Sequence, residues 1–420
     1  MSEPAPSKGN LGLGVLWRIA WRDVTRNKRR SVLSVTAVAL GLTLLIVLNG
    51  LIGGVVADMV ENAVRLQTGH LQWRNENYDE DALSLRPSEL VDDLESRLAR
   101  ARATDGVRAA TPVLWMRGLL STADESLDLR LMGIEPGSQL HTHVRDGIVA
   151  GSLLSADDRD GILLGERLAK SLDVVAGDKV GVAVVSAEGT LDEGAFTVRG
   201  LFNTGIPGYD QGTAFFALDK AQALAQNRGR ASAIMMLLDE PEAADEIAAA
   251  LAEPGLETLT WTELNVTTVE YMTLARRFYW ILDAIVMLVV AVVIANTLLM
   301  AVFERIREMG ILASLGMRRG QIRTLFLLEA LVLGLIGSAL GLVFGLAGVT
   351  WLARNGIDFG EDAVASVGDA YAMGSVMYAR FEPGLILGLT LWTLAVILLV
   401  ALYPARFASR LEPVEALRKG

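Results

Sequence analysis

The sequence predicts a membrane protein with four transmembrane α-helices and a large α+β extracytoplasmic domain between the first and the second. Three observations support this fold class. Hydrophobic residues make up 52% of the 420 residues, and 41 glycines raise the apolar share to roughly 62%, whereas ~45–50% is usual for a soluble domain. Four uncharged stretches are long enough to cross a bilayer. The region between the first two stretches is polar and acidic.

Each of the four stretches reaches the ~20 apolar residues that a membrane-spanning helix needs. They cover residues 31–57, 284–303, 330–353 and 383–405, and the second extends to residue 281 if Asp283 lies at the membrane interface. A buried helix of a soluble protein is the alternative, but ~10–14 apolar residues would be usual for it. The first stretch is also too long for the ~7–15-residue core of a cleaved signal peptide.

Lysine and arginine near the ends of the spans predict the orientation in the membrane. Seven basic residues precede the first span, and the acidic Asp58 and Glu61 follow it directly. Five basic residues lie in 304–323 and four in the tail 406–420, whereas 354–382 holds two basic and five acidic residues. We therefore expect both termini in the cytoplasm.

This topology divides the chain into nine segments. They are a cytoplasmic amphipathic helix (1–30), transmembrane helix 1 (31–57), the extracytoplasmic α+β domain with a helical stalk at its end (58–280), transmembrane helix 2 (281–303), a cytoplasmic coupling segment (304–323), transmembrane helix 3 (324–353), an extracytoplasmic loop (354–382), transmembrane helix 4 (383–405) and a cytoplasmic tail (406–420).

The segment before the first span has a helical pattern with two faces. An apolar face is formed by Leu16, Trp17, Ala20, Trp21 and Val24, and a basic face by Arg18, Arg22 and Arg26. This pattern predicts a basic amphipathic helix on the inner leaflet, in contact with membrane lipids. The alternative is the cytoplasmic end of one long first helix.

Residues 58–280 carry 20 Lys/Arg and 36 Asp/Glu, and such an acidic surface argues against a nucleic-acid partner. Helices are expected at 88–103, where Leu90, Leu94 and Leu98 share a face, and at 241–253. Strands are expected at 107–120, 126–134, 196–202, 214–217 and 231–238, and 161–185 is expected to form strand, helix, turn and strand. The order suggests an α+β module that carries an inserted β-rich one.

The residues that catalysis would need are scarce. Cysteine is absent and there are three histidines. On a strand, His141 and His143 would face one way and could hold a metal, but no third ligand stands at signature spacing, so an ordinary surface pair is the better interpretation. No nucleophile elbow, zinc-protease, EF-hand or P-loop motif occurs. We expect no catalytic residue, no metal site and no cofactor bound by this chain.

Within the spans, Gly337, Gly341 and Gly345 recur every four residues and predict a smooth face for close helix packing. Asp283 and Glu329 lie near span ends. They could belong to an ion path, but interfacial placement or snorkelling is the preferred interpretation.

Three segments, in the same order along the chain, resemble the MacB-type (type VII) ABC transporter permeases. They are WRDVTRNKRR at 21–30, FERIREMGILASLGM at 303–317, and YPAR at 403–406 with LEPVEALR at 411–418. In addition, GHLQ at 69–72 is similar to the strand after the first span in Lol-type members. The layout is closest to the lipoprotein-releasing Lol permeases and more distantly similar to FtsX.

The resemblance implies a non-catalytic permease subunit of the bacterial inner membrane. It would transmit motion from a separate cytoplasmic ABC ATPase, which binds ATP and Mg, to the outside domain, through a stalk at about 262–280. A second permease, the same or a homologous chain, would complete a dimer, and a periplasmic carrier or a lipoprotein could be a further partner. By this resemblance the residues that contact the ATPase are Arg305, Glu308, Met309, Leu315, Gly316 and Arg318.

Release or transport of lipoprotein or lipid-linked cargo is the first functional hypothesis. MacB-like export of peptides, toxins or drugs through an outer-membrane duct is the second, and FtsX-like regulation of an extracytoplasmic hydrolase is the third. A receptor unrelated to ABC transporters is a further alternative; it predicts no loss of ATPase coupling when Glu308 and Gly316 are altered.

Overall fold

The computed structural model describes residues 12–314, 317–360, 363–364 and 373–410. The chain forms two compact units. The helical unit holds the chain up to Gly54, Leu274–Ile357 and the chain from Tyr378 onward, and the sheet unit holds Val55–Thr273 and Asp358–Met377. Two long helices, α2 and α10, contribute residues to both units.

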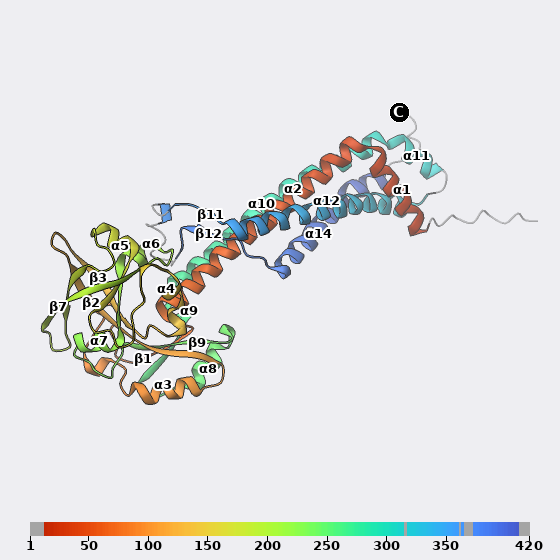
Figure 1. Ribbon diagram of the computed structural model, residues 1–420. Coiled ribbons are helices and arrows are strands. Elements are labelled where there is room, and N and C mark those ends of the chain that lie inside the picture. Colours follow the sequence, from red (N-terminus) through yellow and green to blue (C-terminus); the bar gives the residue numbers. More distant parts are fainter. Residues whose placement is uncertain (1–11, 315–316, 361–362, 365–372, 411–420) are drawn as a thin grey trace, which may run out of the picture. The chain divides into compact units, whose positions relative to one another are not determined.

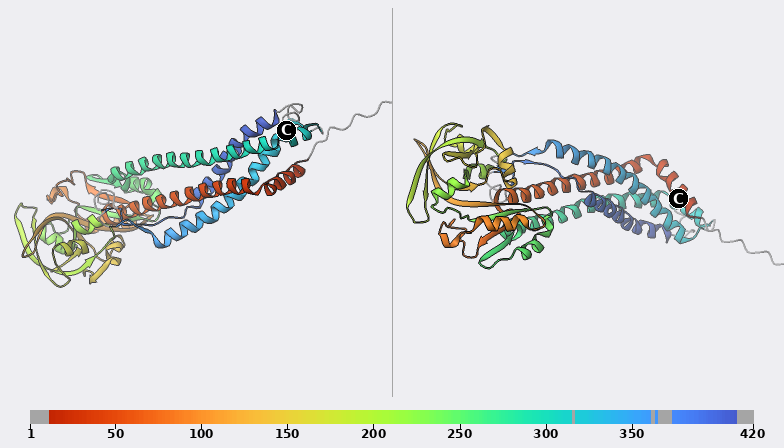
Figure 2. Two further views of the ribbon diagram at one scale, coloured as in Figure 1. Left: turned by 90° about the horizontal axis from the view of Figure 1, so that it is seen from above. Right: turned by 60° about the horizontal axis from the view of Figure 1, so that its bottom comes forward.

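In the described part of the chain, four helices are long and apolar enough to cross a membrane. They are α2 (Lys28–Ala63), α10 (Val266–Glu304), α12 (Arg319–Asn355) and α14 (Pro383–Ser409). Two shorter helices, α1 (Leu13–Arg26) and α11 (Ile306–Ser314), lie at the end of the helical unit where α2 begins (Figures 1 and 2). The four predicted spans each lie on one of the long helices, as expected for segments that must satisfy all backbone hydrogen bonds internally.

The sheet unit is built on one ten-stranded sheet. Its strands are β1 (Leu71–Asn75), β2 (Val107–Ser121), β3 (Ser126–Ile134), β4 (Ile148–Gly151), β5 (Gly161–Gly165), β6 (Lys179–Val185), β7 (Leu191–Phe202), β8 (Thr213–Ala217), β9 (Ala233–Leu238) and β10 (Leu256–Thr260). The long strand β2 is shared: residues 107–113 pair with β9, and residues 114–121 pair with β3.

Six strands close into a ring, because the pairings β2–β3, β3–β8, β8–β5, β5–β7, β7–β6 and β6–β2 are all present (Figure 1). Alternate residues point into this small barrel, as the two-residue period of a strand requires. Leu114, Met116 and Leu120 of β2 meet Phe196 and Phe216 there, all buried. The inserted β-rich module of the prediction is this barrel.

The remaining strands run in the order β10-β1-β9-β2. Helices α3 (Leu94–Ala103) and α8 (Ala244–Leu251) pack on them, around the fully buried Trp73. The other short elements are α4 (Thr142–Asp146), α5 (Glu166–Ser171), α6 (Pro207–Gly212), α7 (Leu218–Leu224), α9 (Trp261–Leu264), a π-helical turn (Val64–Thr68) and 3-10 turns (Pro87–Glu89, Gln139–His141, Pro241–Ala243). Strands β11 (Ile357–Asp358) and β12 (Val376–Met377) form a separate two-stranded sheet.

Two sequence predictions were wrong in this unit. The helix expected at 88–103 begins at Leu94, because Val91 pairs with Ala231 as a β-bridge and Asp93 adopts a left-handed backbone conformation that interrupts the chain before the helix. The pair His141 and His143 does not lie on a strand at the surface. His141 ends a 3-10 turn and is buried, and His143 lies in α4.

Candidate functional site

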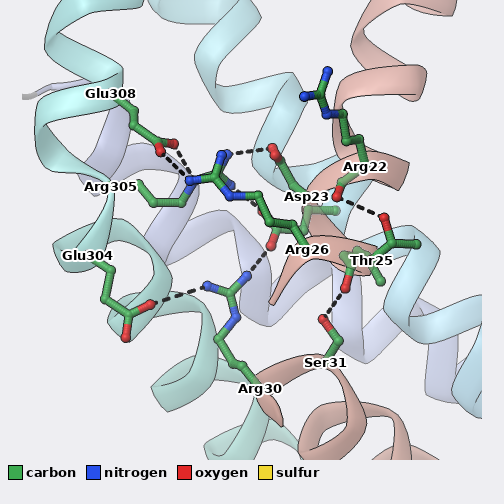
Figure 3. A network of polar contacts seen from close by, with 11 residues as sticks. Arg22, Asp23, Thr25, Arg26, Arg30, Ser31, Glu304, Arg305 and Glu308 are labelled. Carbon is green, nitrogen blue, oxygen red and sulfur yellow. Dashed lines mark hydrogen bonds and ion pairs between the residues drawn. The ribbon is translucent and has the colours of Figure 1, made fainter. Parts of the chain in front are cut away.

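The segment after the second long helix begins with an arginine that contacts several helices. Helix α10 ends at Glu304, and the Arg305 N–H donates to the Val302 carbonyl oxygen at 3.2 Å, which forms a tight turn before α11. The guanidinium of Arg305 lies among three carboxylates: it contacts Asp23 of α1 at 2.7 Å, Glu308 of α11 at 2.9 Å and Glu329 of α12 at 3.7 Å (Figure 3). One side chain therefore joins the root of α11 to two other helices.

A second arginine extends this network. Arg30, near the start of α2, forms an ion pair with Glu329 and lies 3.9 Å from Glu304 (Figure 3). The Glu329 side chain is 1% exposed, so its charge is shared between Arg30 and Arg305 rather than with solvent. The expected snorkelling of Glu329 toward solvent was wrong, because its carboxylate is buried and these two arginines provide the compensation that solvent would otherwise provide.

Burial makes this network sensitive to the loss of any member. The side chains of Asp23 and Arg305 are 8% and 15% exposed. Removing one partner of a buried ion pair costs about 3–5 kcal/mol, because an uncompensated charge remains in a low-dielectric site. Asp23, Arg30, Arg305 and Glu329, called the buried network below, therefore fix how four helices meet.

The network has a weaker, exposed edge. Arg26 lies 3.0 Å from Glu308, but both side chains are largely exposed, and such pairs contribute little and are screened by salt. The hydrogen bond from the Arg305 guanidinium holds the pKa of Glu308 below its usual value, and Arg26 adds to the effect. Glu308 is therefore ionised at neutral pH.

Helix α11 has an inner and an outer face. Its inner residues Ile306, Met309 and Leu312 pack with Leu16 of α1 and Phe326 of α12. The outer face is exposed and carries Arg307, Ile311 and Ser314, at helical spacing. Ile311 is 45% exposed.

The predicted coupling residues are thus divided by the structure. Arg305 and Met309 point inward, Glu308 is half-exposed, and Arg318 is exposed where it precedes α12. Leu315 and Gly316 lie outside the described residues. The outer-face residues Arg307 and Ile311 were not singled out from the sequence, although their spacing, opposite Met309 and Leu312, could have indicated them.

The three predicted packing glycines face α2. A Cβ atom on Gly337 would lie 2.6 Å from Val38, one on Gly341 would lie 2.9 Å from Leu42, and one on Gly345 would lie 2.9 Å from Ile46. Both series advance by four residues, so a row of glycines on α12 meets a row of branched side chains on α2. Only hydrogen at these positions permits this approach.

Two family patterns cover most of the chain. The MacB-like periplasmic core domain matches residues 31–253, more than half of the chain, and the FtsX-like permease C-terminal domain matches residues 280–413. The chain belongs to the MacB-like family of ABC transporter permeases. Members of this family work with a cytoplasmic ATPase, and the four long apolar helices agree with a protein of the inner membrane.

Individual relatives of this permease match over different lengths. The lipoprotein-releasing system transmembrane protein LolC of Neisseria meningitidis is 25% identical over 411 residues, which cover 92% of this chain and 94% of that protein. The macrolide export ATP-binding/permease protein MacB of Nitrobacter winogradskyi is 35% identical over 137 residues, which cover 33% of this chain and 18% of that protein.

Among solved structures, the periplasmic region of MacB from Actinobacillus actinomycetemcomitans is similar with a TM-score of 0.33 and 16% identity. The matching region covers 49% of this chain and 94% of the solved chain. The family assignment rests on the sequence matches.

In this permease, the residues of the buried network were partly missed by sequence reasoning. Asp23 and Arg30 lie in the WRDVTRNKRR segment, where they were counted only as charges beside a span. A second polar pair lies within the spans: the Asn49 side-chain amide donates to both carboxylate oxygens of Asp283, at 3.0 and 3.2 Å. The signal that could have found the Asn49–Asp283 pair is a charged residue within an apolar helix, which usually has a partner on a neighbouring helix.

Proposed function

We propose that this permease couples a separate cytoplasmic ATPase to work on the other side of the membrane, and that α11 is the element the ATPase moves. The buried network carries this proposal. Because Arg305 at the root of α11 forms ion pairs with α1 and α12, and Arg30 links Glu329 to α2, displacement of α11 changes the contacts of three further helices at once.

The outer face of α11 supplies the contact surface in this proposal. Arg307, Ile311 and Ser314 are exposed, and a short helix with an apolar and basic face fits a groove on a partner protein. Arg305 and Met309 act from inside, as positioning residues for this face. ATP and Mg are bound by the ATPase, and the permease supplies no catalytic group.

The proposed topology places α1, α11 and both termini in the cytoplasm, since basic residues are concentrated on those segments. The sheet unit then lies outside. A second permease chain, the same or homologous, completes the assembly.

For the cargo, we propose lipoprotein or another lipid-linked molecule. The support is the match to a lipoprotein-releasing permease along 92% of this chain, whereas the match to the macrolide exporter covers 33%. The MacB-like pattern of the outside domain keeps export through a duct as the second candidate.

Photo-crosslinking in native membranes tests the ATPase contact. A photoreactive residue replaces Ile311 in the full chain, and a matched variant carries it at Leu119, which is similarly exposed in the barrel (45% and 43%). We expect an ABC ATPase to crosslink at position 311 and not at position 119. Repeated absence of an ATPase at position 311, with the chain still expressed in the membrane, would contradict the proposal.

The cargo is tested by purifying the crosslinked complex in mild detergent and identifying bound molecules by mass spectrometry. Acylated N-terminal peptides or a lipoprotein carrier support the cargo assignment. If a duct component or a cell-wall hydrolase is found in their place, the proposed ATPase coupling still holds and the cargo assignment is wrong.

A further inference from the structure

Helix α1 carries two apolar stripes, and only one is used inside the protein. Leu16, Ala20 and Val24 are buried, and Leu16 and Val24 pack against residues of α12 and neighbouring helices. The second stripe is exposed and recurs every four residues: Leu13 is 70% exposed, Trp17 38% and Trp21 49%. Two exposed tryptophans on one short helix are unusual for a surface that faces water alone.

The arginines of α1 border this exposed stripe. At about 100° per residue, the order around the helix is the buried stripe, then Trp17 and Trp21, then Gly14, then Arg18 and Arg22. Both arginines are exposed, and among the described residues neither has an ion pair; Figure 3 shows the Arg22 guanidinium directed away from Arg305. The one acidic residue of α1, Asp23, faces the protein and contacts Arg305.

The position of α1 along the chain places this surface at the membrane boundary. Helix α2 begins with the exposed Lys28 and Arg29, and its uncharged stretch starts at Ser31. Tryptophan is favoured at the level of lipid headgroups, and clustered basic residues beside a span attract anionic lipids. The apolar and the basic parts of α1 thus match the apolar and the anionic parts of an anionic lipid.

We infer that α1 binds anionic phospholipid, with Trp17 and Trp21 at the boundary between headgroups and acyl chains and Arg18 and Arg22 on the phosphates, and that this contact stabilises the root of α11 through Asp23. The lipid contact itself needs no ATPase. The effect on α11 rests on the proposed function, because it makes the coupling element sensitive to the lipid around the permease.

The lipid contact can be measured on the full chain. The sequence has no cysteine, and a Cβ on Gly14 meets nothing within 4 Å, so Gly14→Cys accepts a bimane fluorophore between the tryptophan and arginine stripes. The labelled protein is reconstituted in vesicles of phosphatidylcholine and phosphatidylglycerol, with bromine on the acyl chains of one lipid or of the other.

We expect brominated phosphatidylglycerol to quench at least ~2-fold more strongly than brominated phosphatidylcholine at equal bromine content. The preference is lost in R18Q/R22Q and kept in R276Q/R277Q, a matched pair of exposed arginines on α10. Equal quenching by both lipids, no quenching by either, or a preference that survives R18Q/R22Q would each overturn the lipid site.

Hydrogen exchange tests the effect on α11. Backbone amides of residues 306–312 should exchange several-fold more slowly in vesicles with phosphatidylglycerol than in phosphatidylcholine alone, and R18Q/R22Q should remove this difference. Exchange that does not depend on the lipid would overturn the link through Asp23. Neither measurement includes an ATPase, so failure of the proposed coupling leaves both results intact.

Discussion

The buried network of the helical unit and the His141 site of the sheet unit bury polar groups in opposite ways. In the helical unit, Glu329 is buried with two arginines around it, and Asp23 is buried against Arg305. In the sheet unit, His141 is buried without a charged partner, and burial lowers its pKa to about 4, so it is neutral at physiological pH. The buried network pairs its groups with opposite charges, and the His141 site excludes the charge.

This difference follows from the solvent around each unit. In a bilayer there is no hydrophobic driving force between helices, so specific polar contacts and close packing decide how they meet. In water, a core of many apolar side chains supplies the stability, as in the barrel. The helical unit should therefore respond strongly to single substitutions at a few positions.

The largest effect is expected from Arg305→Ala, because it leaves Asp23 and part of the Glu329 charge uncompensated. We expect a loss of about 3–5 kcal/mol in the stability of this helical contact, seen as a lower melting temperature of the full chain in detergent and faster hydrogen exchange in α11. Arg307→Ala, two positions away on the exposed face, is the control and should change neither. Equal effects of the two variants would show that the network does not hold α11.

The next effect concerns pH and the sheet unit. Because the pKa of His141 is about 4 when folded and ~6.5 when unfolded, the unfolded chain binds more protons in this range. The stability contribution of neutral His141 is complete above pH 6.5 and is lost as the pH falls toward 4, by up to about 3 kcal/mol.

Asp210 opposes this change, because burial raises its pKa to about 6 and its ionisation lowers stability as the pH rises from about 4 to 6. His141→Gln should therefore reduce the loss of stability in acid, and the remaining loss comes from His143 and His70, whose pKa values burial also lowers. Hydrogen exchange of residues 139–146 in the full chain, corrected for intrinsic rates, measures this. A variant that loses as much protection in acid as the unsubstituted chain would exclude His141 as the cause.

The smallest of the three effects is expected at the glycine row. Gly341→Ala places a methyl group 2.9 Å from Leu42 and 3.0 Å from the Ala39 carbonyl oxygen, and overpacking of this kind costs about 1–3 kcal/mol. Gly388→Ala in α14 is the control, since nothing lies within 4 Å of the added group, and better helix propensity should leave it neutral or stabilising. Thermal unfolding of both variants in the same detergent measures the difference in stability. Equal stability would show that α2 and α12 do not pack closely at Gly341.

The sequence was sufficient for features that repeat along the chain. The four spans, the strand pattern of the outside domain and the glycine spacing depend on composition and period, and these are local. The buried network was not accessible in the same way. Asp23, Arg30 and Glu329 are far apart in the chain, and each has an ordinary local explanation as a charge beside a span.

The faces of α11 show an intermediate case. The resemblance to the permease family indicated residues between 305 and 318, but it grouped the inward-facing Arg305 and Met309 with exposed residues. Which side of a nine-residue helix faces the protein depends on the helices that pack against it, here α1 and α12, and this information is tertiary.

The pairing of β1 with β10 constrains the biogenesis of the protein. Leu71 lies opposite Thr260, so one edge of β1 has no partner until the last strand of this unit is made, while the other edge pairs with β9. The barrel can form earlier, since its strands lie between residues 107 and 217, but sheet closure requires nearly the whole domain to have been translocated. Such non-local pairing is slow and leaves an unpaired strand edge exposed in the meantime. A nascent chain that ends before residue 256 therefore leaves one edge of β1 open to chaperones and proteases, whereas β9 already lies between β1 and β2.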